Sequence, residues 1–233
     1  MAENDQKAPK METTDVADAI VAENNEIKND VTRGQKYVMW GMIAISAIAI
    51  LVVIYIFAIR NPAVKSANEA VAQADITMLQ GNDSLALAQY QQVAKEYGYD
   101  AGNNASLMAA ALLYKKGEYQ QAIDQLKNYS PKEAIVGAAA KSLEGDCYVN
   151  LGNYDAAVKC YDSAIKISDN NSYYTPLFMI KKATVLREQG KYADEVKVLE
   201  NIRENYPEYC NTYRFEVDKY VARAKYQAEN ASK

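Results

Sequence analysis

The sequence contains no histidine among its 233 residues. Histidine is the commonest general base, the commonest metal ligand and the usual pH switch near neutrality, so its absence excludes three frequent kinds of site. The sequence also lacks a Gly-rich phosphate-binding loop and a nucleophile placed beside a base. We therefore predict no catalytic residue, no metal, no cofactor and no small-molecule substrate, and we do not expect an enzyme.

Cysteine is scarce, and basic residues are not concentrated anywhere in the chain. Cys147, Cys160 and Cys210 have a spacing that fits no zinc or haem site, so the simplest interpretation is three small buried side chains. The alternative is a disulfide between Cys147 and Cys160, which an oxidising compartment would permit. Lys and Arg number 26 against 30 Asp and Glu and form no basic run, which argues against nucleic-acid binding.

The longest uncharged segment is residues 37–59. As a helix it would span about 35 Å, against about 30 Å for the hydrocarbon core of a bilayer. Trp40 and Tyr55 lie toward its ends, where aromatic rings favour the interface, and Arg60 follows it. A cleavable signal peptide is the rival interpretation, but the run is too long and lacks an Ala-x-Ala ending. We predict a single transmembrane helix.

Residues 1–36, which precede this span, hold eight acidic residues against five basic ones and no aromatic residue. Such a composition cannot bury a core, so we predict a disordered acidic tail. Apolar residues do recur there at roughly helical spacing, so a short helix is the alternative. Three basic residues flank the span on its N-terminal side and two on its C-terminal side, which favours a cytoplasmic N-terminus. In a bacterium the span would lie in the cytoplasmic (inner) membrane and the C-terminal domain in the periplasm.

Glycine recurs at a nearly regular interval in the remaining chain. Gly81, Gly117, Gly152 and Gly190 are separated by 36, 35 and 38 residues, close to the repeat length of stacked helical hairpins. Glycine supplies the left-handed backbone that ends the first helix of such a hairpin. We predict an all-α fold: an α-solenoid of three to four hairpins at about 63–97, 103–130, 138–168 and 176–206, with a capping helix at 211–228, in a domain at 60–233.

The third hairpin carries the most complete signature, with Gly145, Tyr148, Gly152, Tyr154, Ala157, Tyr161 and Ala164. This set resembles the tetratricopeptide repeat. Glu195 departs from it, because the fourth hairpin would have a small residue there. The tail, the span, the repeats and the final helix together resemble the YfgM-type proteins, ancillary subunits of the Sec translocon. That resemblance implies a membrane-anchored scaffold or co-chaperone that contacts the Sec translocon and periplasmic chaperones. Assembly scaffolding for another envelope complex is the alternative.

The first helices of such hairpins line a concave surface on which a partner binds. A clamp for a C-terminal carboxylate is disfavoured, since Leu107, Ser142 and Ile180 stand where basic residues would be needed. We expect an extended or helical apolar segment instead, oriented by one acidic and one basic side chain. The predicted partner-binding residues are Leu107, Tyr114, Asp146, Val149, Leu177, Ile180 and Arg187.

Overall fold

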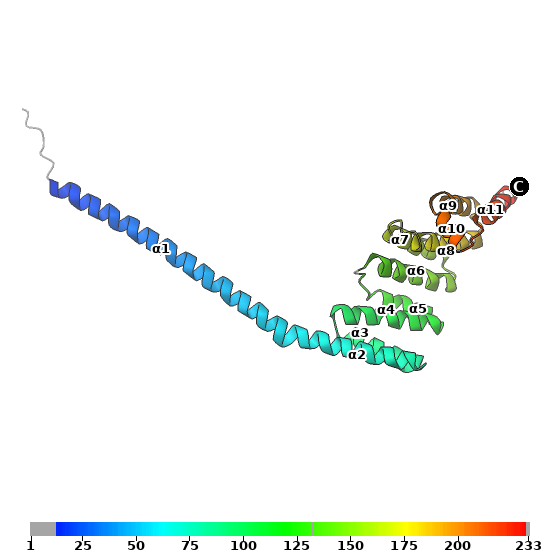
Figure 1. Ribbon diagram of the computed structural model, residues 1–233, viewed down its shortest axis with the longest axis horizontal. Helices are drawn as coiled ribbons and strands as arrows, with labels where there is room; N and C mark the ends of the chain where they lie inside the picture. The colour runs from blue at the N-terminus through cyan, green and yellow to red at the C-terminus, as the bar shows by residue number, and fades with distance from the viewer. Residues whose placement is uncertain (1–12, 132, 232–233) are drawn as a thin grey trace, which may run out of the picture. The chain divides into compact units, whose positions relative to one another are not determined.

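The computed structural model describes residues 13–131 and 133–231, which divide into an N-terminal unit, Met1–Pro62, and a repeat unit, Ala63–Lys233. Helix α1 covers Thr13–Ile54, and a π-helical turn, η1, follows at Tyr55–Arg60 (Figure 1). The predicted disordered tail falls partly on residues 1–12, outside the described residues. From Thr13 the structure differs from that prediction, because the segment up to Arg33 contains no Gly or Pro to interrupt a helix.

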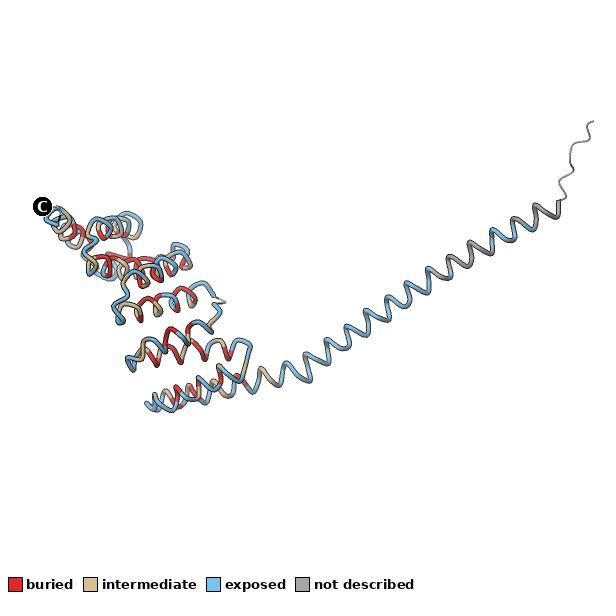
Figure 2. Tube along the Cα trace, turned by 180° about the vertical axis from the view of Figure 1, so that it is seen from behind, coloured by how far each residue is buried: buried red, intermediate tan, exposed pale blue. Residues whose placement is uncertain are grey.

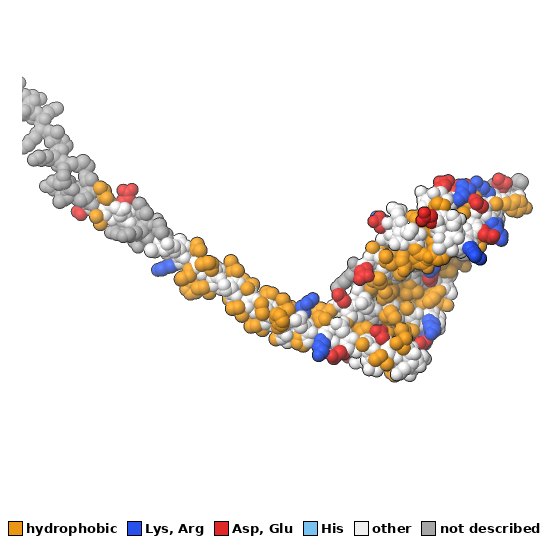
Figure 3. Space-filling model, viewed as in Figure 1, with side chains coloured by type: hydrophobic (Ala, Val, Ile, Leu, Met, Phe, Trp, Pro, Cys, Tyr) orange, Lys and Arg blue, Asp and Glu red, His pale blue; other side chains and the backbone are white. Residues whose placement is uncertain are grey.

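One long apolar helix lies near the N-terminus. Within the helical stretch Gly34–Leu79, an 18-residue window reaches a mean hydropathy of 3.0, and none of that window is buried. Figure 2 shows residues 34–60 of this stretch exposed almost throughout, and Figure 3 shows hydrophobic side chains along them with basic side chains beyond both ends. By length and composition it is compatible with a single-pass membrane anchor.

The repeat unit consists of helical hairpins stacked one on the next, and the part of the chain that the structure describes contains no strand (Figure 1). The prediction of an all-α solenoid is confirmed. The hairpins are α2 (Asn61–Leu79) with α3 (Asp83–Glu96), α4 (Tyr99–Lys115) with α5 (Tyr119–Leu126), α6 (Ala134–Asn150) with α7 (Tyr154–Ile167), and α8 (Tyr174–Glu188) with α9 (Tyr192–Asn205).

The same turn joins the two helices of every hairpin. The four glycines that mark the period have φ between 70° and 82°, a left-handed conformation that only glycine adopts readily. In the third hairpin the Asn153 N–H donates to the Tyr148 carbonyl (2.9 Å), and the Gly152 N–H donates to the Val149 carbonyl (3.0 Å). The other three turns repeat this pair of bonds, which satisfies carbonyls left free at a helix end.

The first and third hairpins share a polar tie between their two helices. The Tyr90 hydroxyl donates to Asp75, and the Tyr161 hydroxyl donates to Asp146 (2.7 Å), each across 15 residues. Both rings are buried, so the hydroxyls need these partners. The two ties occupy matching positions, with the acid six residues before the turn glycine and the tyrosine nine residues after it.

The C-terminal cap is interrupted, which differs from the single helix predicted at 211–228. A short helix, α10 (Pro207–Thr212), ends where Arg214 takes a left-handed backbone (φ 52°), and α11 (Val217–Ala231) begins afterwards. Val217, Val221 and Ala224 lie on one face of α11 and join an apolar cluster that includes Leu199 and Ile202 of α9. The cap therefore begins at Val217 and covers the last hairpin.

The three cysteines are free thiols and all are buried. Cys147 is fully inaccessible and belongs to the cluster that joins the first three hairpins. The disulfide alternative is therefore not realised in this structure, and the cysteines act as small apolar side chains.

Alkaline pH is expected to destabilise the repeat unit through Cys147. Burial raises the pKa of this thiol from 9.0 to about 12, with a further contribution from Asp146. Because the folded pKa is the higher one, the unfolded chain loses the proton first, so the stabilisation is complete below about pH 9 and lost as the pH rises toward about 12. In urea titrations the Cys147→Ala variant should lose stability less steeply, by up to about 1.4 kcal/mol per pH unit. Equal slopes would contradict this.

Candidate functional site

A cavity of about 510 Å³ lies between the first helices of the first three hairpins. This volume is in the range of pockets that hold small molecules and cofactors. Its walls come from α2, from the N-terminal half of α4, from the first turn of α6 and from the connection between α5 and α6. The lining residues are Val71, Asp75, Asp100, Asn103, Asn104, Leu107, Met108, Tyr129, Glu133 and Val136.

The shape of this cavity depends on one side chain, Asn103. Its amide nitrogen donates to the Ser130 carbonyl (2.7 Å), and its amide oxygen accepts from the Ser130 N–H (2.7 Å). These two bonds tie the connection after α5 to the first turn of α4. Tyr129 and Glu133 lie on either side of Ser130 and are thereby held at the cavity wall.

The cavity carries mainly negative charge. Asp75, Asp100 and Glu133 line it, and no Lys or Arg is among its described lining residues. The N-terminal turns of α4 and α6 also face it and contribute a partial positive charge, about half a unit each. Burial raises the pKa of the Tyr129 hydroxyl, and Glu133 adds to that rise. Burial and the adjacent Asp75 likewise raise the pKa of Tyr90.

Of the seven predicted partner-binding residues, Leu107 is the one that lines this cavity. Tyr114 lies further along α4, where burial and then Asp146 raise the pKa of its hydroxyl. Val149 packs against the cluster of Ala157, Tyr161 and Val185. All seven side chains are half-buried, so each keeps some accessible surface.

Both carboxylate oxygens of Asp146 are engaged within the protein. One accepts from the Tyr161 hydroxyl (2.7 Å), and the other pairs with Lys181 Nζ of α8 (2.6 Å). Lys181 also donates to the buried Ser142 hydroxyl (3.0 Å). Asp146 therefore ties the third hairpin to the fourth, which is a different task from the predicted one of orienting a partner.

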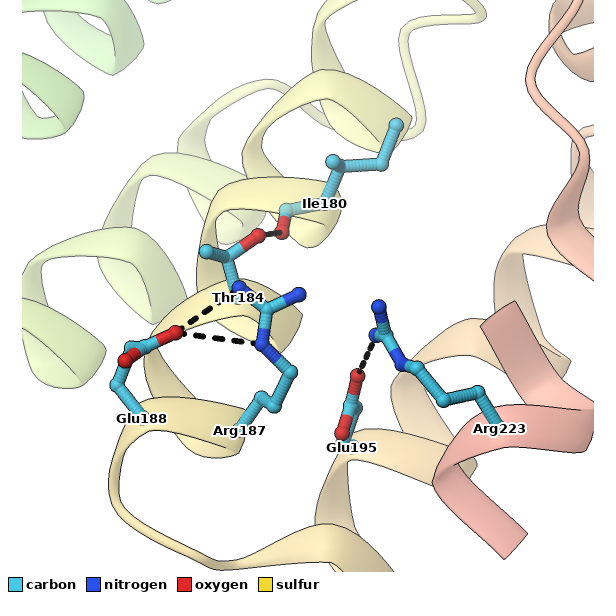
Figure 4. Close-up of polar contacts among 6 residues, drawn as sticks. All are labelled: Ile180, Thr184, Arg187, Glu188, Glu195 and Arg223. Atoms are coloured by element: carbon cyan, nitrogen blue, oxygen red, sulfur yellow. Dashed lines mark hydrogen bonds and ion pairs between the residues drawn. The ribbon is translucent and has the colours of Figure 1, made fainter. Parts of the chain in front are cut away.

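The predicted residues of α8 are not among the described residues that line the cavity. Figure 4 shows two of them, Ile180 and Arg187, on α8. Arg187 pairs with its sequence neighbour Glu188, with nitrogen–oxygen distances of 2.9 Å and 3.3 Å. Ile180 packs against the C-terminal apolar cluster, and Leu177 is half-buried one turn earlier. The structure thus divides the predicted set between the cavity, the C-terminal end of α4, the third hairpin and α8, and it does not bring the seven residues into one pocket.

Glu195 forms an ion pair with a residue that is distant in the sequence. It is 1% exposed and occupies the small-residue position of the fourth hairpin. Arg223 of α11 donates to it (2.7 Å), as Figure 4 shows, and the guanidinium also lies 5.1 Å from the centre of the Tyr220 ring. Glu195, which departs from the repeat signature, is therefore the residue to which the cap helix α11 is attached.

Sequence reasoning missed most of the cavity lining. Asp75 could have been found, because it stands six residues before its turn glycine, as Asp146 does. Tyr129, Glu133 and Val136 gave no such signal, since their place depends on the tie between Asn103 and Ser130. Among the described residues no group of three or more His, Cys, Asp or Glu side chains could hold a metal ion.

Comparison with known proteins agrees with this geometry. A family model described as a tetratricopeptide repeat-like domain matches residues 64–184, and one described as a tetratricopeptide repeat matches residues 179–209. No curated protein matches the chain.

Among solved structures, MamA is 17% identical, with a TM-score of 0.52 over 72% of this chain and 90% of MamA. YrrB, described as a TPR protein with an unusual peptide-binding site, is 14% identical, with a TM-score of 0.53 over 72% of this chain and 84% of YrrB. At these identities the likeness concerns the fold.

Proposed function

Because this chain belongs to the tetratricopeptide repeat-like family, we propose that it is a protein-binding scaffold that holds segments of other proteins on the concave side of its repeat unit. The observation that carries this proposal is the cavity between α2, α4 and α6. It combines apolar side chains, which bury a partner's apolar surface, with carboxylates and amides, which fix orientation. The peptide-binding site described for YrrB adds a precedent for such use of this fold.

The apolar N-terminal helix is the basis for proposing where the scaffold is located in the cell. We propose that residues 37–59 cross the bacterial cytoplasmic membrane once, with the N-terminus in the cytoplasm and the repeat unit in the periplasm. The anchor then holds the cavity close to the membrane surface. A high effective concentration results, so that weak contacts with partners beside the membrane form often.

The finer proposal is a co-chaperone beside the secretion machinery, as in the YfgM-type proteins. Emerging polypeptides would contact the repeat unit and then pass to periplasmic chaperones, and no step requires catalysis or a cofactor. The alternative is a scaffold for assembly of another envelope complex. Either function needs the same concave surface, so the identity of the partners separates them.

Site-specific photo-crosslinking in intact cells tests this proposal. A benzophenone amino acid replaces Asn104, an exposed residue at the cavity, and in a second strain it replaces Lys159, an exposed residue on α7 away from the cavity. Mass spectrometry then identifies the adducts of each. We expect protein adducts from position 104 that are absent or at least about tenfold weaker from position 159, because binding is confined to the concave side.

The adducts also decide between the two finer functions. Translocon subunits and periplasmic chaperones at position 104 would support the secretion-linked role, whereas one stable complex of other envelope proteins would support assembly scaffolding. Equal adducts at both positions would contradict a concave binding surface. A variant with the benzophenone residue in place of Glu208, an exposed residue of α10 outside the cavity lining, is a second control for crosslinking from any exposed position.

A further inference from the structure

We infer that the cavity between α2, α4 and α6 selects polypeptide segments in which a Lys or Arg side chain stands among apolar residues. This inference rests on the proposed function, because it names the kind of segment that the concave surface would hold. Three features carry it: the apolar part of the wall, the arrangement of the carboxylates, and the contrast with a second cavity of the same unit.

The apolar part of the wall comes from all three helices. Val71 of α2, Leu107 and Met108 of α4, and Val136 of α6 line the cavity, and each is half-buried. Their remaining accessible surface is apolar, and covering it is favourable at about 25 cal/mol per Å². A bound segment therefore needs aliphatic side chains at the positions that face these residues.

The carboxylates add a requirement for positive charge. The Tyr90 hydroxyl donates to one oxygen of Asp75, which fixes the orientation of this half-buried carboxylate. The other oxygen of Asp75 accepts no hydrogen bond among the described residues. Glu133 stands on the α6 side of the cavity and is exposed at its rim. A guanidinium or ammonium group that enters between them would meet acceptors on two sides.

Among the described residues that line the cavity, acidic charge outweighs the partial positive charge of the helix termini. The N-terminal turns of α4 and α6 contribute about half a unit of positive charge each, while Asp75 and Glu133 carry one negative unit each. An acidic segment would therefore be repelled at the cavity, and a cationic one attracted. Attraction of this kind weakens as salt is added.

A second cavity of the repeat unit lacks this bias. It measures about 360 Å³ and includes Asp162, Lys182 and Lys197 in its lining. Asp162 pairs with Lys182 at 2.5 Å, so the acid is already neutralised. Selection for a basic segment is thus a property of the cavity at α2, α4 and α6, and a charge-dependent effect can be assigned to it by substitution.

The test uses the full chain in nanodiscs of phosphatidylcholine, whose headgroup carries no net charge. Three fluorescein-labelled peptides share one short frame of Leu, Val and Ala, and two central positions are Arg, Gln or Glu. Fluorescence anisotropy measures the Kd of each, and empty nanodiscs measure binding to lipid. We expect the Arg peptide to bind at least about tenfold more tightly than the Gln peptide, and the Glu peptide to bind most weakly.

Two substitutions assign the effect to the cavity. Asn104→Arg adds a positive charge at an exposed lining position, and Glu133→Gln removes a negative one. Each should reduce the preference for the Arg peptide over the Gln peptide by about threefold or more. Glu208→Gln removes an equally exposed carboxylate outside the cavity and should leave the preference unchanged. Unaltered thermal unfolding of each variant shows that the fold is retained.

The outcomes separate this inference from the proposed function. If all three peptides bind equally and Asn104→Arg weakens them equally, the concave surface binds segments without charge selection, and the inference is overturned. If none of the peptides binds while crosslinking at position 104 succeeds, the inference again fails and the proposed function stands. If Glu208→Gln reduces the preference as much as Glu133→Gln, the effect is one of overall charge and the cavity is not its source.

Discussion

Replacing Tyr161 by alanine is expected to lower the free energy of unfolding of the repeat unit by about 3–5 kcal/mol. The ring is 2% exposed and lies where Gly145 leaves space: a Cβ atom at Gly145 would meet it at 2.8 Å. The hydroxyl donates to Asp146. Truncation would therefore leave a cavity between α6 and α7 and remove one of the two partners of a half-buried carboxylate.

Urea unfolding of the full chain in detergent micelles, followed by circular dichroism, measures this loss. Tyr161→Phe keeps the ring and removes only the hydrogen bond, so it should cost about 1–2 kcal/mol. Tyr226→Ala truncates a tyrosine that is 70% exposed and should change stability by less than about 0.5 kcal/mol. If Tyr161→Ala proved no more costly than Tyr226→Ala, the central hairpin would not be held by this ring.

Because Tyr161→Ala would weaken the fold, it is unsuitable for testing partner binding. Each hairpin of a stacked array contacts only its neighbours, so a weakened third hairpin separates the cavity from the fourth hairpin and its cap. Reversing the charge of Asp146 would have a similar effect, because its oxygens bind Tyr161 and Lys181. Loss of partner binding in such a variant would report a damaged fold. Asn104 and Glu133 are better probes of binding.

Arg223→Ala is expected to destabilise the chain by about 3 kcal/mol, because it leaves the carboxylate of Glu195 buried without its cation. Glu195 is 1% exposed, while the Arg223 side chain is 36% exposed. The pair is incompletely satisfied even when intact, since Glu195 Oε2 and Arg223 Nε are buried without a hydrogen-bond partner. Its main contribution is therefore to position α11 against α9.

A double substitution distinguishes a buried unpaired charge from a simple loss of packing. Glu195→Ala restores the small residue found at the matching positions Ala86, Ala122 and Ala157, so the Glu195→Ala, Arg223→Ala variant should recover most of the lost stability. Lys219→Ala removes a partner from an exposed ion pair with Glu216 and should cost less than about 1 kcal/mol. A double variant as unstable as Arg223→Ala would show that the cap depends on the arginine itself.

Features set by short stretches of chain could be predicted from the sequence. Each of the four hairpin turns needs one residue with a left-handed backbone. A glycine occupies that position in every turn, just after the end of the first helix, and so shows in the sequence where that helix ends. The apolar helix is likewise apparent from a continuous uncharged run. The break after Thr212 was not predicted, because a left-handed arginine is rare and its neighbours carry no turn signal.

The lining of the cavity was predictable only in part. The first helices could be identified as the lining of the concave side, and Leu107, one of the predicted partner-binding residues, lines the cavity. The remaining wall depends on a bond pair between Asn103 and Ser130, separated by 27 residues. The partners of Asp146 and Glu195 are 35 and 28 residues away in the sequence. Backbone conformation depends mainly on each residue and its close neighbours, so it could be predicted from the sequence. The pairing of side chains from different hairpins depends on how the hairpins stack, and only the tertiary structure shows that stacking.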